Sequence, residues 1–359
     1  MKLNNFFDIK PYSLDRIKKS KYLKSYFFEL TQFHYENCTK YRNMLDALGY
    51  EHKRQQDYSE IPFLPVRLFK MFDLYSIPKG DIVKTMRSSG TSGQNVSKIY
   101  LDKKAALNQS IALTKIVSSY LGAKRTPMII IDSQEVLKDR KMFSARGAGI
   151  LGFSIFGTKR MYALNENMEL KVDDVLAFIE ENENNRILIF GFTFMVYKHF
   201  IKEIKKRNIK IDLSNSVLIH GGGWKKLVNE SITSEEFQKM LNQLCGITSV
   251  HDYYGMVEQT GSIFMECEYS NMHASNLSDV FIRRPHDFSI ADVGERGIIQ
   301  TLSILPTSYP GHSLLTEDEG VLLGEDDCKC GRLGKYFKIL GRVKNAELRG
   351  CSDTYAEQF

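Results

Sequence analysis

The sequence predicts an α/β protein with parallel-containing sheets, an N-terminal helical segment and a β-rich closing lobe. Before residue 50, apolar residues recur every three to four positions among charged ones, which is typical of helix. In the middle of the chain, short runs rich in Ile, Val and Leu alternate with amphipathic stretches, a pattern that favours a sheet with parallel pairs. After about residue 276, helix signals fade and turns multiply.

The elements follow in order from these patterns. Helix is expected over residues 14–49, and Pro62 and Pro65 interrupt helix beyond it. Strands are expected at residues 82–86, 97–101, 128–132, 186–191 and 216–221, with helices at about 173–183 and 194–207.

Composition narrows the class of protein. The 359 residues are 43% apolar and 26% charged, the balance of a globular protein. A net charge of +6, from 49 basic and 43 acidic residues, is too dilute to indicate a nucleic-acid-binding protein. The sequence has no signal-peptide pattern and no membrane-spanning apolar run, so we expect a cytoplasmic protein whose six cysteines serve as thiols, metal ligands or a nucleophile.

The first motif that indicates chemistry is a run of small polar residues between two expected strands. It consists of Ser88, Ser89, Gly90, Thr91, Ser92 and Gly93. Glycines allow close backbone approach, and hydroxyl and amide groups together can cradle phosphate oxygens. The Walker pattern is absent, which argues against a P-loop kinase or GTPase. Alone, such a run is also typical of an ordinary turn.

Three later segments change that balance: Tyr253–Gly261, Leu315–Gly320 and Leu340–Asn345. In this order after the Ser/Thr/Gly loop, they resemble the core motifs of the adenylate-forming superfamily of acyl-CoA synthetases, peptide-synthetase adenylation domains and luciferases. Within it the chain is most similar to the LuxE-type acyl-protein synthetases of bacterial bioluminescence, with phenylacetate-CoA ligases as more distant relatives. Supporting segments are Phe33–Tyr35, Ile61–Pro65, Phe69–Lys70, Gly221–Lys225, Ser308–Pro310 and Arg349–Cys351.

The resemblance implies a role for each motif. The Ser88–Gly93 loop would hold the β- and γ-phosphates of ATP. The adenine would be framed by Gly221, Gly222, Gly223, Tyr254 and Gly255. Glu258 would bind Mg²⁺, Asp318 the ribose hydroxyls, and Arg342 the ribose or a phosphate at a hinge. These residue types suit adenylation, since the reaction develops negative charge on phosphates that N–H groups, cations and a bound metal stabilise.

The resemblance also implies a domain organisation. Residues 1–340 would form the large adenylation domain, and residues 341–359 a hinge and a short tail. Typical members of the superfamily continue after the hinge arginine into a small C-terminal lid domain with a catalytic lysine, which is absent after Arg342 here. LuxE-type chains also stop early. The sequence does not identify the element that covers the active site in place of this lid. A partner subunit is one alternative.

Cys351 in the tail corresponds to the cysteine that LuxE-type enzymes are held to acylate. A thiolate attacks an acyl-adenylate and forms a thioester that can pass the acyl group on. Cationic Lys344 and Arg349 would lower the pKa of this thiol. Without the resemblance, the alternative is an incidental cysteine in a flexible end.

A second set of thiols indicates a metal. Cys267 and His273 are followed by Cys328 and Cys330, a three-sulfur, one-nitrogen set that suits tetrahedral structural zinc. The Cys-x-Cys spacing is tighter than usual, so four unconnected side chains are the alternative. Phenylacetate-CoA ligases have a similar Cys/His pair and Cys-x-Cys-Gly-Arg turn, which strengthens the zinc interpretation.

The predicted activity is ATP-dependent activation of a carboxylic acid, fatty or aryl, followed by transfer of the acyl group to Cys351. One alternative is an acid ligase that donates to CoA or a carrier protein. Another is a non-catalytic adenylation fold that serves as a scaffold. An acyl-CoA-reductase-type subunit, a carrier protein or CoA would be the final acyl acceptor. The acid itself, the acceptor and the pathway are not encoded in these motifs.

Overall fold

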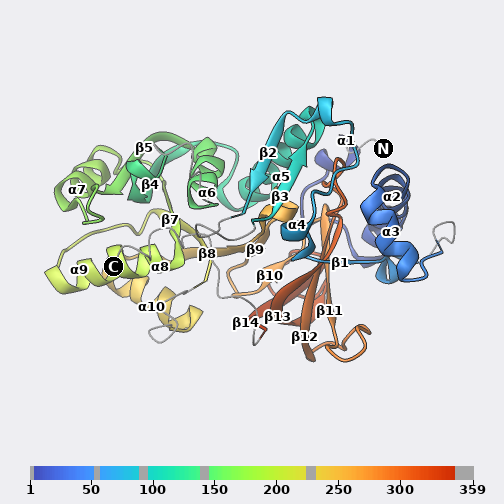
Figure 1. Ribbon diagram of the computed structural model, residues 1–359. Coiled ribbons are helices and arrows are strands. Elements are labelled where there is room, and N and C mark those ends of the chain that lie inside the picture. The colour runs from blue at the N-terminus through green and yellow to red at the C-terminus, as the bar shows by residue number, and fades with distance from the viewer. Residues whose placement is uncertain (1–3, 52–56, 89–95, 138–144, 224–231, 344–359) are drawn as a thin grey trace. The chain divides into compact units, whose positions relative to one another are not determined.

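The computed structural model describes residues 4–51, 57–88, 96–137, 145–223 and 232–343 (Figure 1). The chain forms two compact units. Unit 1 contains residues 1–88, 93–120 and 255–347, and unit 2 contains residues 89–92, 121–254 and 348–359. Among the described residues, no helix has both the length and the apolar character needed to cross a membrane. The predicted boundaries at residues 340 and 341 stay a prediction.

Unit 1 begins with helices α1 (Asn4–Phe7), α2 (Arg16–Asn37) and α3 (Thr39–Ala47). The Asp15 side chain caps α2 by accepting a hydrogen bond from the Lys18 amide. Helix α2 buries Leu23, Phe27 and Leu30 in a core shared with the β-rich part of unit 1. The expected single helix over residues 14–49 is wrong at Cys38, whose extended backbone (φ −124°, ψ 96°) separates α2 from α3.

The β-rich part of unit 1 confirms the predicted closing lobe. Its strands are β9 (Phe264–Glu266), β10 (Met272–His273), β11 (Ser278–Arg283), β12 (Arg296–Ser303), β13 (Ser313–Glu325) and β14 (Lys335–Arg342). They pair antiparallel in the order β11-β12-β13-β14-β10-β9, and β1 (Leu64–Pro65) adds to β13 in parallel. These strands are drawn in orange and red in Figure 1.

Short helical elements and a hairpin complete unit 1. The helical elements are η1 (Tyr58–Glu60), α4 (Leu68–Met71), η2 (Lys79–Asp81), η7 (Val257–Gln259) and the longer α5 (Lys103–Leu121). The hairpin pairs β2 (Lys84–Arg87) with β3 (Lys98–Leu101). Its two strands lie within two residues of the expected positions. In the sequence, the Ser/Thr/Gly motif lies between these two strands.

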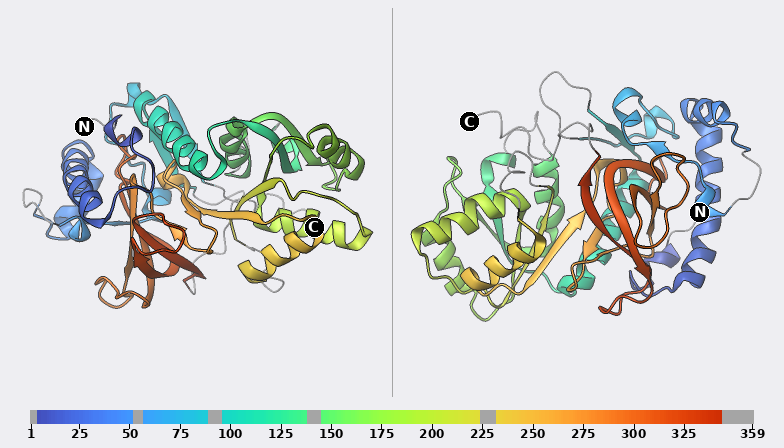
Figure 2. Two further views of the ribbon diagram at one scale, coloured as in Figure 1. Left: turned by 180° about the vertical axis from the view of Figure 1, so that it is seen from behind. Right: turned by 90° about the horizontal axis from the view of Figure 1, so that it is seen from below.

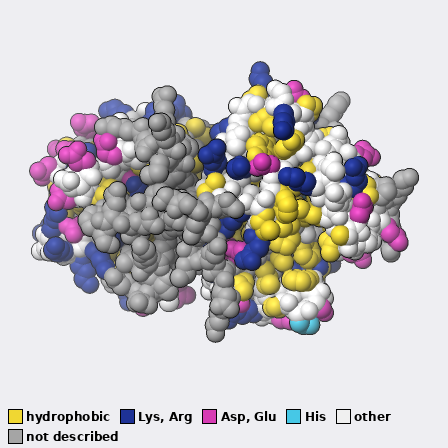
Figure 3. Space-filling model, in the orientation of Figure 1, with side chains coloured by type: hydrophobic (Ala, Val, Ile, Leu, Met, Phe, Trp, Pro, Cys, Tyr) yellow, Lys and Arg dark blue, Asp and Glu magenta, His cyan; other side chains and the backbone are white. Residues whose placement is uncertain are grey.

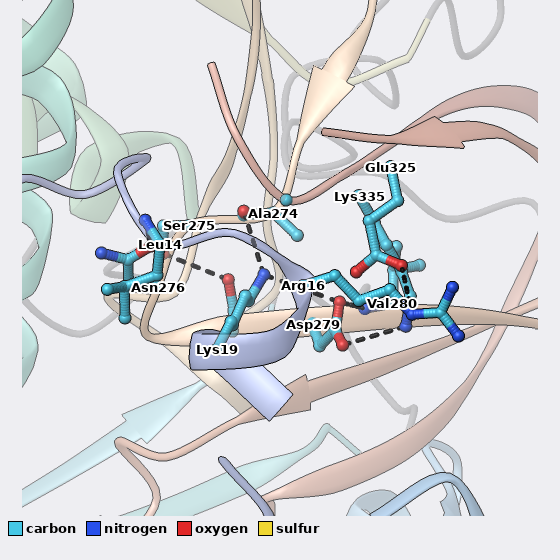
Figure 4. A network of polar contacts seen from close by, with 12 residues as sticks. Leu14, Arg16, Lys19, Ala274, Ser275, Asn276, Asp279, Val280, Glu325 and Lys335 are labelled. Carbon is cyan, nitrogen blue, oxygen red and sulfur yellow. Dashed lines mark hydrogen bonds and ion pairs between the residues drawn. The ribbon is translucent and has the colours of Figure 1, made fainter. Parts of the chain in front are cut away.

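A buried ionic network joins helix α2 to the β-rich lobe (Figure 4). The Asp279 carboxylate lies 2.9 Å from the Lys335 Nζ and 3.6 Å from the Lys19 Nζ, and Tyr58 donates a hydrogen bond to it at 2.8 Å. The Lys19 ammonium also donates to the Ala274 carbonyl. Burial alone would raise the pKa of Asp279, but the two ammonium groups outweigh it and hold that pKa below its usual value.

Removing the negative charge from this network is expected to destabilise the protein strongly. The Asp279→Asn variant removes the nearest counter-charge of two buried ammonium groups, and we expect a loss of about 3–5 kcal/mol in the free energy of unfolding. Urea unfolding measures it. The control is Asp292→Asn, because Asp292 pairs with Arg284 but its side chain is 90% exposed, and its urea midpoint should hardly move. Equal midpoints for both variants would contradict a stabilising role.

The stability that Asp279 contributes is expected to depend on pH. Because the folded pKa of Asp279 is depressed, its contribution to stability is present above the ordinary carboxyl pKa and is lost as the pH falls through the folded value. The stability difference between parent and Asp279→Asn should therefore shrink below about pH 4, the model-peptide value of an aspartate.

Unit 2 is a parallel sheet covered by helices. Its strands are β4 (Thr126–Ser133), β5 (Gly157–Leu164), β6 (Ile187–Phe192), β7 (Ser216–Gly221) and β8 (Ser249–Tyr254), in the order β8-β7-β6-β4-β5. All four adjacent pairs are parallel. Three of these strands lie where the sequence predicts them, because buried parallel strands are continuous apolar runs.

The helices of unit 2 lie on both faces of this sheet, as Figure 2 shows. They are α6 (Ala145–Phe153), α7 (Val172–Glu181), α8 (Thr193–Met195), the π-helical η5 (Val196–Ile201), α9 (Lys202–Arg207) and α10 (Ser234–Cys245), with short turns η3 (Gln134–Leu137) and η4 (Ser154–Phe156). Thr233 and Glu236 form a capping box at the start of α10, and Gly246 ends it with a left-handed φ of 73°.

Candidate functional site

Glu258, the predicted magnesium ligand, lies in the 3₁₀ turn η7 of unit 1. Its side chain is buried, and burial raises the pKa of the carboxyl. Hydrogen bonds fix the turn. The Tyr309 hydroxyl donates to the Glu258 carbonyl at 2.8 Å, and the side-chain amide of Gln259 donates to the carbonyls of Thr301 and Gly311. The backbone that carries Glu258 is therefore held rigidly by the β-rich lobe.

Two glycines permit this close packing. A Cβ at Gly311 would lie 2.8 Å from the Glu258 carbonyl oxygen. Gly261 has a φ of 87°, and a Cβ there would lie 2.7 Å from the carbonyl oxygen of Gln109 in α5. Any side chain at either position would displace the turn.

Ser88, the first residue of the Ser/Thr/Gly motif, is hydrogen-bonded to Ser97, just before strand β3. The Ser88 amide donates to the Ser97 carbonyl at 3.0 Å, and the Ser97 amide donates to the Ser88 Oγ at 2.9 Å. The Ser97 side chain lowers the pKa of the Glu258 carboxyl, against the larger effect of burial. Ser89, Gly90, Thr91, Ser92 and Gly93 lie outside the described residues. Ser88 is thus the residue of the motif that lies within the described part of the structure.

Positive charge gathers in the same part of unit 1. Figure 3 shows Lys and Arg side chains where Figure 1 places β2, β3 and α4. The sequence of these elements and their flanks supplies Arg67, Lys70, Lys84, Arg87 and Lys98. The positive charge of Lys70 acts on Glu258 and opposes the effect of burial on its pKa. This surface suits a polyanion such as a nucleotide triphosphate.

Asp318 and Arg342 face each other across strands β13 and β14. Their register makes them direct partners, and the Arg342 Nε lies 3.6 Å from the Asp318 Oδ1. Both side chains are partly exposed. Next to Asp318, Glu317 accepts hydrogen bonds from the Arg67 guanidinium at 2.9 and 3.0 Å. The structure thus brings together the predicted ribose carboxylate and the predicted hinge arginine.

The predicted adenine motif is divided between the units. Gly221 ends β7 in unit 2, Gly222 and Gly223 follow it, and Tyr254 ends β8 there. A Cβ at Gly221 would lie 2.3 Å from the ring of Tyr253, so only glycine allows that ring to pack flat on the strand end. Gly222 has a φ of 78°. Gly255 belongs to unit 1, where a Cβ would lie 3.0 Å from Ile263.

An aromatic cluster lies on the same face of the unit 2 sheet. Phe153 of α6 stacks on Phe190 of β6 with a centroid distance of 4.4 Å, and it contacts the Tyr253 ring at 5.0 Å. Phe192, two residues along β6, packs beside Phe190. The sequence predicts that residues around Phe190–Phe194 and the Gly221–Lys225 turn line the acid pocket, because their aromatic character suits a fatty or aryl acid. Residues 224 and 225 of that turn lie outside the described residues.

The four predicted zinc ligands converge in unit 1. One ligand atom each of Cys267, His273, Cys328 and Cys330 lies within 4.8 Å of all the others. The Cys267 and Cys328 Sγ atoms are 4.0 Å apart, and the Cys330 Sγ lies 3.3 Å from the His273 Nε2. Ligands of tetrahedral zinc lie about 3.3–3.8 Å from one another. The four side chains therefore have a spacing close to that of a zinc site.

The surroundings of the cluster suit sulfur ligands. Backbone amides of Tyr269 and Arg332 donate to the Sγ atoms of Cys267 and Cys330, each at 3.4 Å, and the Asn271 side chain lies 3.5 Å from the Cys328 Sγ. Burial lowers the pKa of His273 to about 4, so its ring is neutral at pH 7, as metal binding requires. The Tyr336 ring stacks on the imidazole at 5.7 Å.

Comparison with known proteins identifies the family. The family described as "Acyl-protein synthetase, LuxE" matches residues 3–359. The chain belongs to the LuxE family. Two similar relatives are the long-chain-fatty-acid–luciferin-component ligases of Vibrio harveyi and Aliivibrio fischeri. The LuxE chain is 23% identical to the first over 341 residues, 91% of this chain and 85% of the relative. It is 23% identical to the second over 333 residues, which are 90% of this chain and 85% of the relative.

Solved structures show the fold of the LuxE chain. A 2-hydroxyisobutyryl-CoA ligase in the postadenylation state, in complex with 2-HIB-AMP, superposes with a TM-score of 0.73. The match covers 93% of the LuxE chain and 70% of the ligase, at 14% identity. The predicted adenylate-forming fold is confirmed, and the LuxE resemblance predicted from the motifs is confirmed as well.

The structure reveals site residues that the sequence reasoning missed. The sequence patterns gave no role to Tyr309, Ser97 or the Arg67–Glu317 pair. Tyr309 nevertheless lies in the Ser308–Pro310 segment, which supports the resemblance to LuxE-type enzymes. For Ser97, the sequence does contain a signal. The alternation of buried and partly exposed residues along β3 places residue 97 facing inward, and this residue has a hydroxyl group. Cys351 lies outside the described residues, so its predicted role rests on the sequence.

Proposed function

We propose that this LuxE-family chain uses ATP to activate a carboxylic acid and then takes the acyl group on Cys351. In the first step a carboxylate oxygen attacks the α-phosphorus of ATP, and the bond to pyrophosphate breaks. In the second step the Cys351 thiolate attacks the acyl carbon of the mixed anhydride, and AMP leaves. The observation that carries the proposal is the pairing of Asp318 with Arg342 in the same unit as the buried Glu258, whose backbone Tyr309 holds by a hydrogen bond.

Each proposed role follows from the chemistry of the residue. Glu258 supplies a carboxylate oxygen for Mg²⁺, which would neutralise phosphate charge during transfer. Asp318 accepts hydrogen bonds from the ribose hydroxyls, and Arg342 beside it supplies positive charge to ribose or phosphate. The loop residues 88–93 hold phosphate oxygens. The adenine is framed by Gly221, Gly222, Gly223, Tyr254 and Gly255.

We propose a long-chain fatty acid as the substrate. The named relatives are ligases of long-chain fatty acids, and this similarity supports the proposal. Burial of each methylene of an acyl chain contributes about 0.8 kcal/mol, so the affinity of an apolar binding site rises with chain length. The final acceptor is proposed to be a reductase-type subunit. The predicted cytoplasmic location stays a prediction.

A panel of acids tests the substrate and the acceptor together. The protein is incubated with ATP, Mg²⁺ and acids of increasing length, and hydroxylamine traps activated acyl groups as hydroxamates. We expect hydroxamate to rise with chain length, without any need for CoA. Consumption of CoA with no acylated protein would favour the CoA-ligase alternative, and a carrier protein is tested in the same way. No product with any acid would favour the scaffold.

We further propose that Cys267, His273, Cys328 and Cys330 hold one structural zinc ion. The donor set, its spacing and the N–H donors around the sulfurs fit a closed four-ligand site. Bound there, zinc would fix the turn after β13 to the β9–β10 segment, since the ligands come from both. It has no part in the proposed reaction.

Metal analysis of the purified protein is expected to return about one zinc per chain, the stoichiometry of a single four-ligand site. The Cys328→Ser variant should lose the metal and melt lower by roughly 5 °C or more, because the binding free energy contributes to folding. The control is Cys245→Ser, a buried thiol in unit 2, which should keep its zinc. A metal-free parent whose melting is unaffected by chelator would refute the site.

A further inference from the structure

Two buried histidines, His34 of α2 and His312 just before β13, stack on each other inside unit 1 and are called the histidine pair below. Their ring centroids are 5.1 Å apart with an interplanar angle of 26°. The Tyr41 ring of α3 meets both imidazoles edge-on. Burial lowers the pKa of His34 to about 3 and that of His312 well below its usual value, so both rings are neutral at pH 7. The histidine pair is therefore held by hydrogen bonds between neutral groups.

The hydrogen bonds of His34 fix its tautomer. The Pro306 carbonyl can only accept, so the His34 Nε2 donates to it at 3.0 Å. The His34 Nδ1 then accepts, and the Ser76 hydroxyl donates to it at 2.7 Å. The Ser76 amide in turn donates to the Ser308 carbonyl at 2.8 Å. His34 thus fastens helix α2 to residues 304–312, which connect β12 to β13.

His312 makes a second connection to α2 from the end of the same segment. The Thr31 hydroxyl donates to the Phe27 carbonyl at 2.8 Å, so its oxygen is free to accept from the His312 Nε2 at 2.9 Å. The His312 carbonyl accepts from the Ser303 amide at 2.9 Å. The two imidazoles therefore bind residues 304–312 to one helix at two points.

The segment that the histidine pair holds also holds Glu258. The Tyr309 hydroxyl donates to the Glu258 carbonyl at 2.8 Å, and the Gly311 carbonyl accepts from the Gln259 side-chain amide at 2.8 Å. Both groups lie between the two points at which the histidine pair binds the segment. A shift of residues 304–312 away from α2 would therefore move both hydrogen-bonding partners of the turn η7.

We propose that the two members of the histidine pair are positioning residues for Glu258: they hold residues 304–312 against α2, and this segment holds the turn that carries the carboxylate. This role rests on the proposed function, in which Glu258 binds Mg²⁺. Groups that orient a metal ligand change metal affinity without touching the metal. Phe33–Tyr35 and Ser308–Pro310, two segments that support the resemblance to LuxE-type enzymes, act together in this arrangement.

The test compares His34→Leu with His34→Gln. Leucine removes both hydrogen bonds, whereas glutamine keeps an N–H donor and an acceptor oxygen. The readout is the Mg²⁺ concentration that gives half-maximal acid-dependent ATP–pyrophosphate exchange at saturating ATP. We expect about a tenfold increase for His34→Leu and a value closer to the parent's for His34→Gln. Should leucine prevent folding, Ser76→Ala replaces it, with an expected increase of about fivefold, the size of one neutral hydrogen bond.

The matched control is His199→Leu in unit 2. His199 is also buried, and its ring nitrogen also binds a backbone carbonyl, that of Met168 at 2.9 Å. This variant should lower the urea midpoint, as His34→Leu does, but leave the Mg²⁺ requirement at the parental value. An equal increase in the Mg²⁺ requirement of both variants would mark a merely structural effect and overturn the proposal, and so would an unchanged requirement in His34→Leu.

A double-variant cycle tests the route of the effect. Tyr309→Phe removes the hydroxyl that holds the Glu258 carbonyl. If the histidine pair acts through residues 304–312, the Mg²⁺ requirement of His34→Leu combined with Tyr309→Phe rises by less than the product of the two single factors, because part of the shared interaction is already lost. A rise equal to the product would overturn the proposal. A parent without any exchange would instead overturn the proposed function, and this inference with it.

Discussion

Replacing Glu258 by alanine is expected to lower the rate of acyl-adenylate formation by about a hundredfold or more, because it removes the carboxylate that anchors Mg²⁺ at the phosphates. Binding of ATP without metal should change little, since the ribose and phosphate-loop contacts remain. Single-turnover formation of acyl-AMP measures the rate, and calorimetry measures the binding. The side chain is buried and its backbone is held by Tyr309, so the turn should keep its conformation.

Asp318→Ala separates binding from chemistry. It should raise the KM for ATP about tenfold through the lost ribose hydrogen bonds, with a smaller effect on kcat. The control is Glu319→Ala, the next residue on β13, whose partner is Arg296. Glu319→Ala should behave like the parent.

The outcome that would contradict the Glu258 prediction is equally clear. If Glu258→Ala makes acyl-AMP at the parental rate, Glu258 is not the metal ligand.

The second large effect concerns the acyl acceptor. Cys351→Ser should form acyl-AMP at the parental rate, because no thiol is needed until the mixed anhydride exists. It should carry no hydroxylamine-sensitive label when incubated with ATP and a radiolabelled fatty acid, whereas the parent carries about one acyl group per chain, the product of one nucleophile. Denaturing electrophoresis and intact-protein mass measure the label.

The control for the label is Cys38→Ala, which removes a thiol buried in the core of unit 1. This variant should be acylated like the parent. Labelling of Cys351→Ser at the parental level would move the acceptor to another residue. Removal of residues 350–359 should reproduce the Cys351→Ser result without a change in melting temperature.

Local patterns predicted the sheets well, for reasons that are visible in particular strands. Strand β7 falls on residues 216–221 as expected, since all six residues are buried and a glycine turn follows. The break at Cys38 was not predicted, because the helical spacing of apolar residues continues through it. Hydrophobic periodicity records which residues face a core, but it does not record the backbone angle of a single residue between two helices.

The candidate site was predictable where ligand chemistry demands a residue type. The thiol–imidazole set and the Asp318–Arg342 pair are close in space, although up to 63 residues separate the zinc ligands along the chain. Tyr309 was missed, because its importance comes from a hydrogen bond to the Glu258 carbonyl that only the fold creates. The division into two compact units was also not predicted, since no linker-like composition marks residues 121 or 254.

The central claim is reversible adenylation of an acid by this chain. The most direct test is acid-dependent exchange of radiolabelled pyrophosphate into ATP by the purified parent protein with Mg²⁺, in the absence of CoA and of any other protein. We predict exchange that requires the acid, increases with the length of its acyl chain and falls by about a hundredfold in Glu258→Ala. Absence of exchange with every acid, in protein that is folded and melts normally, would contradict the account.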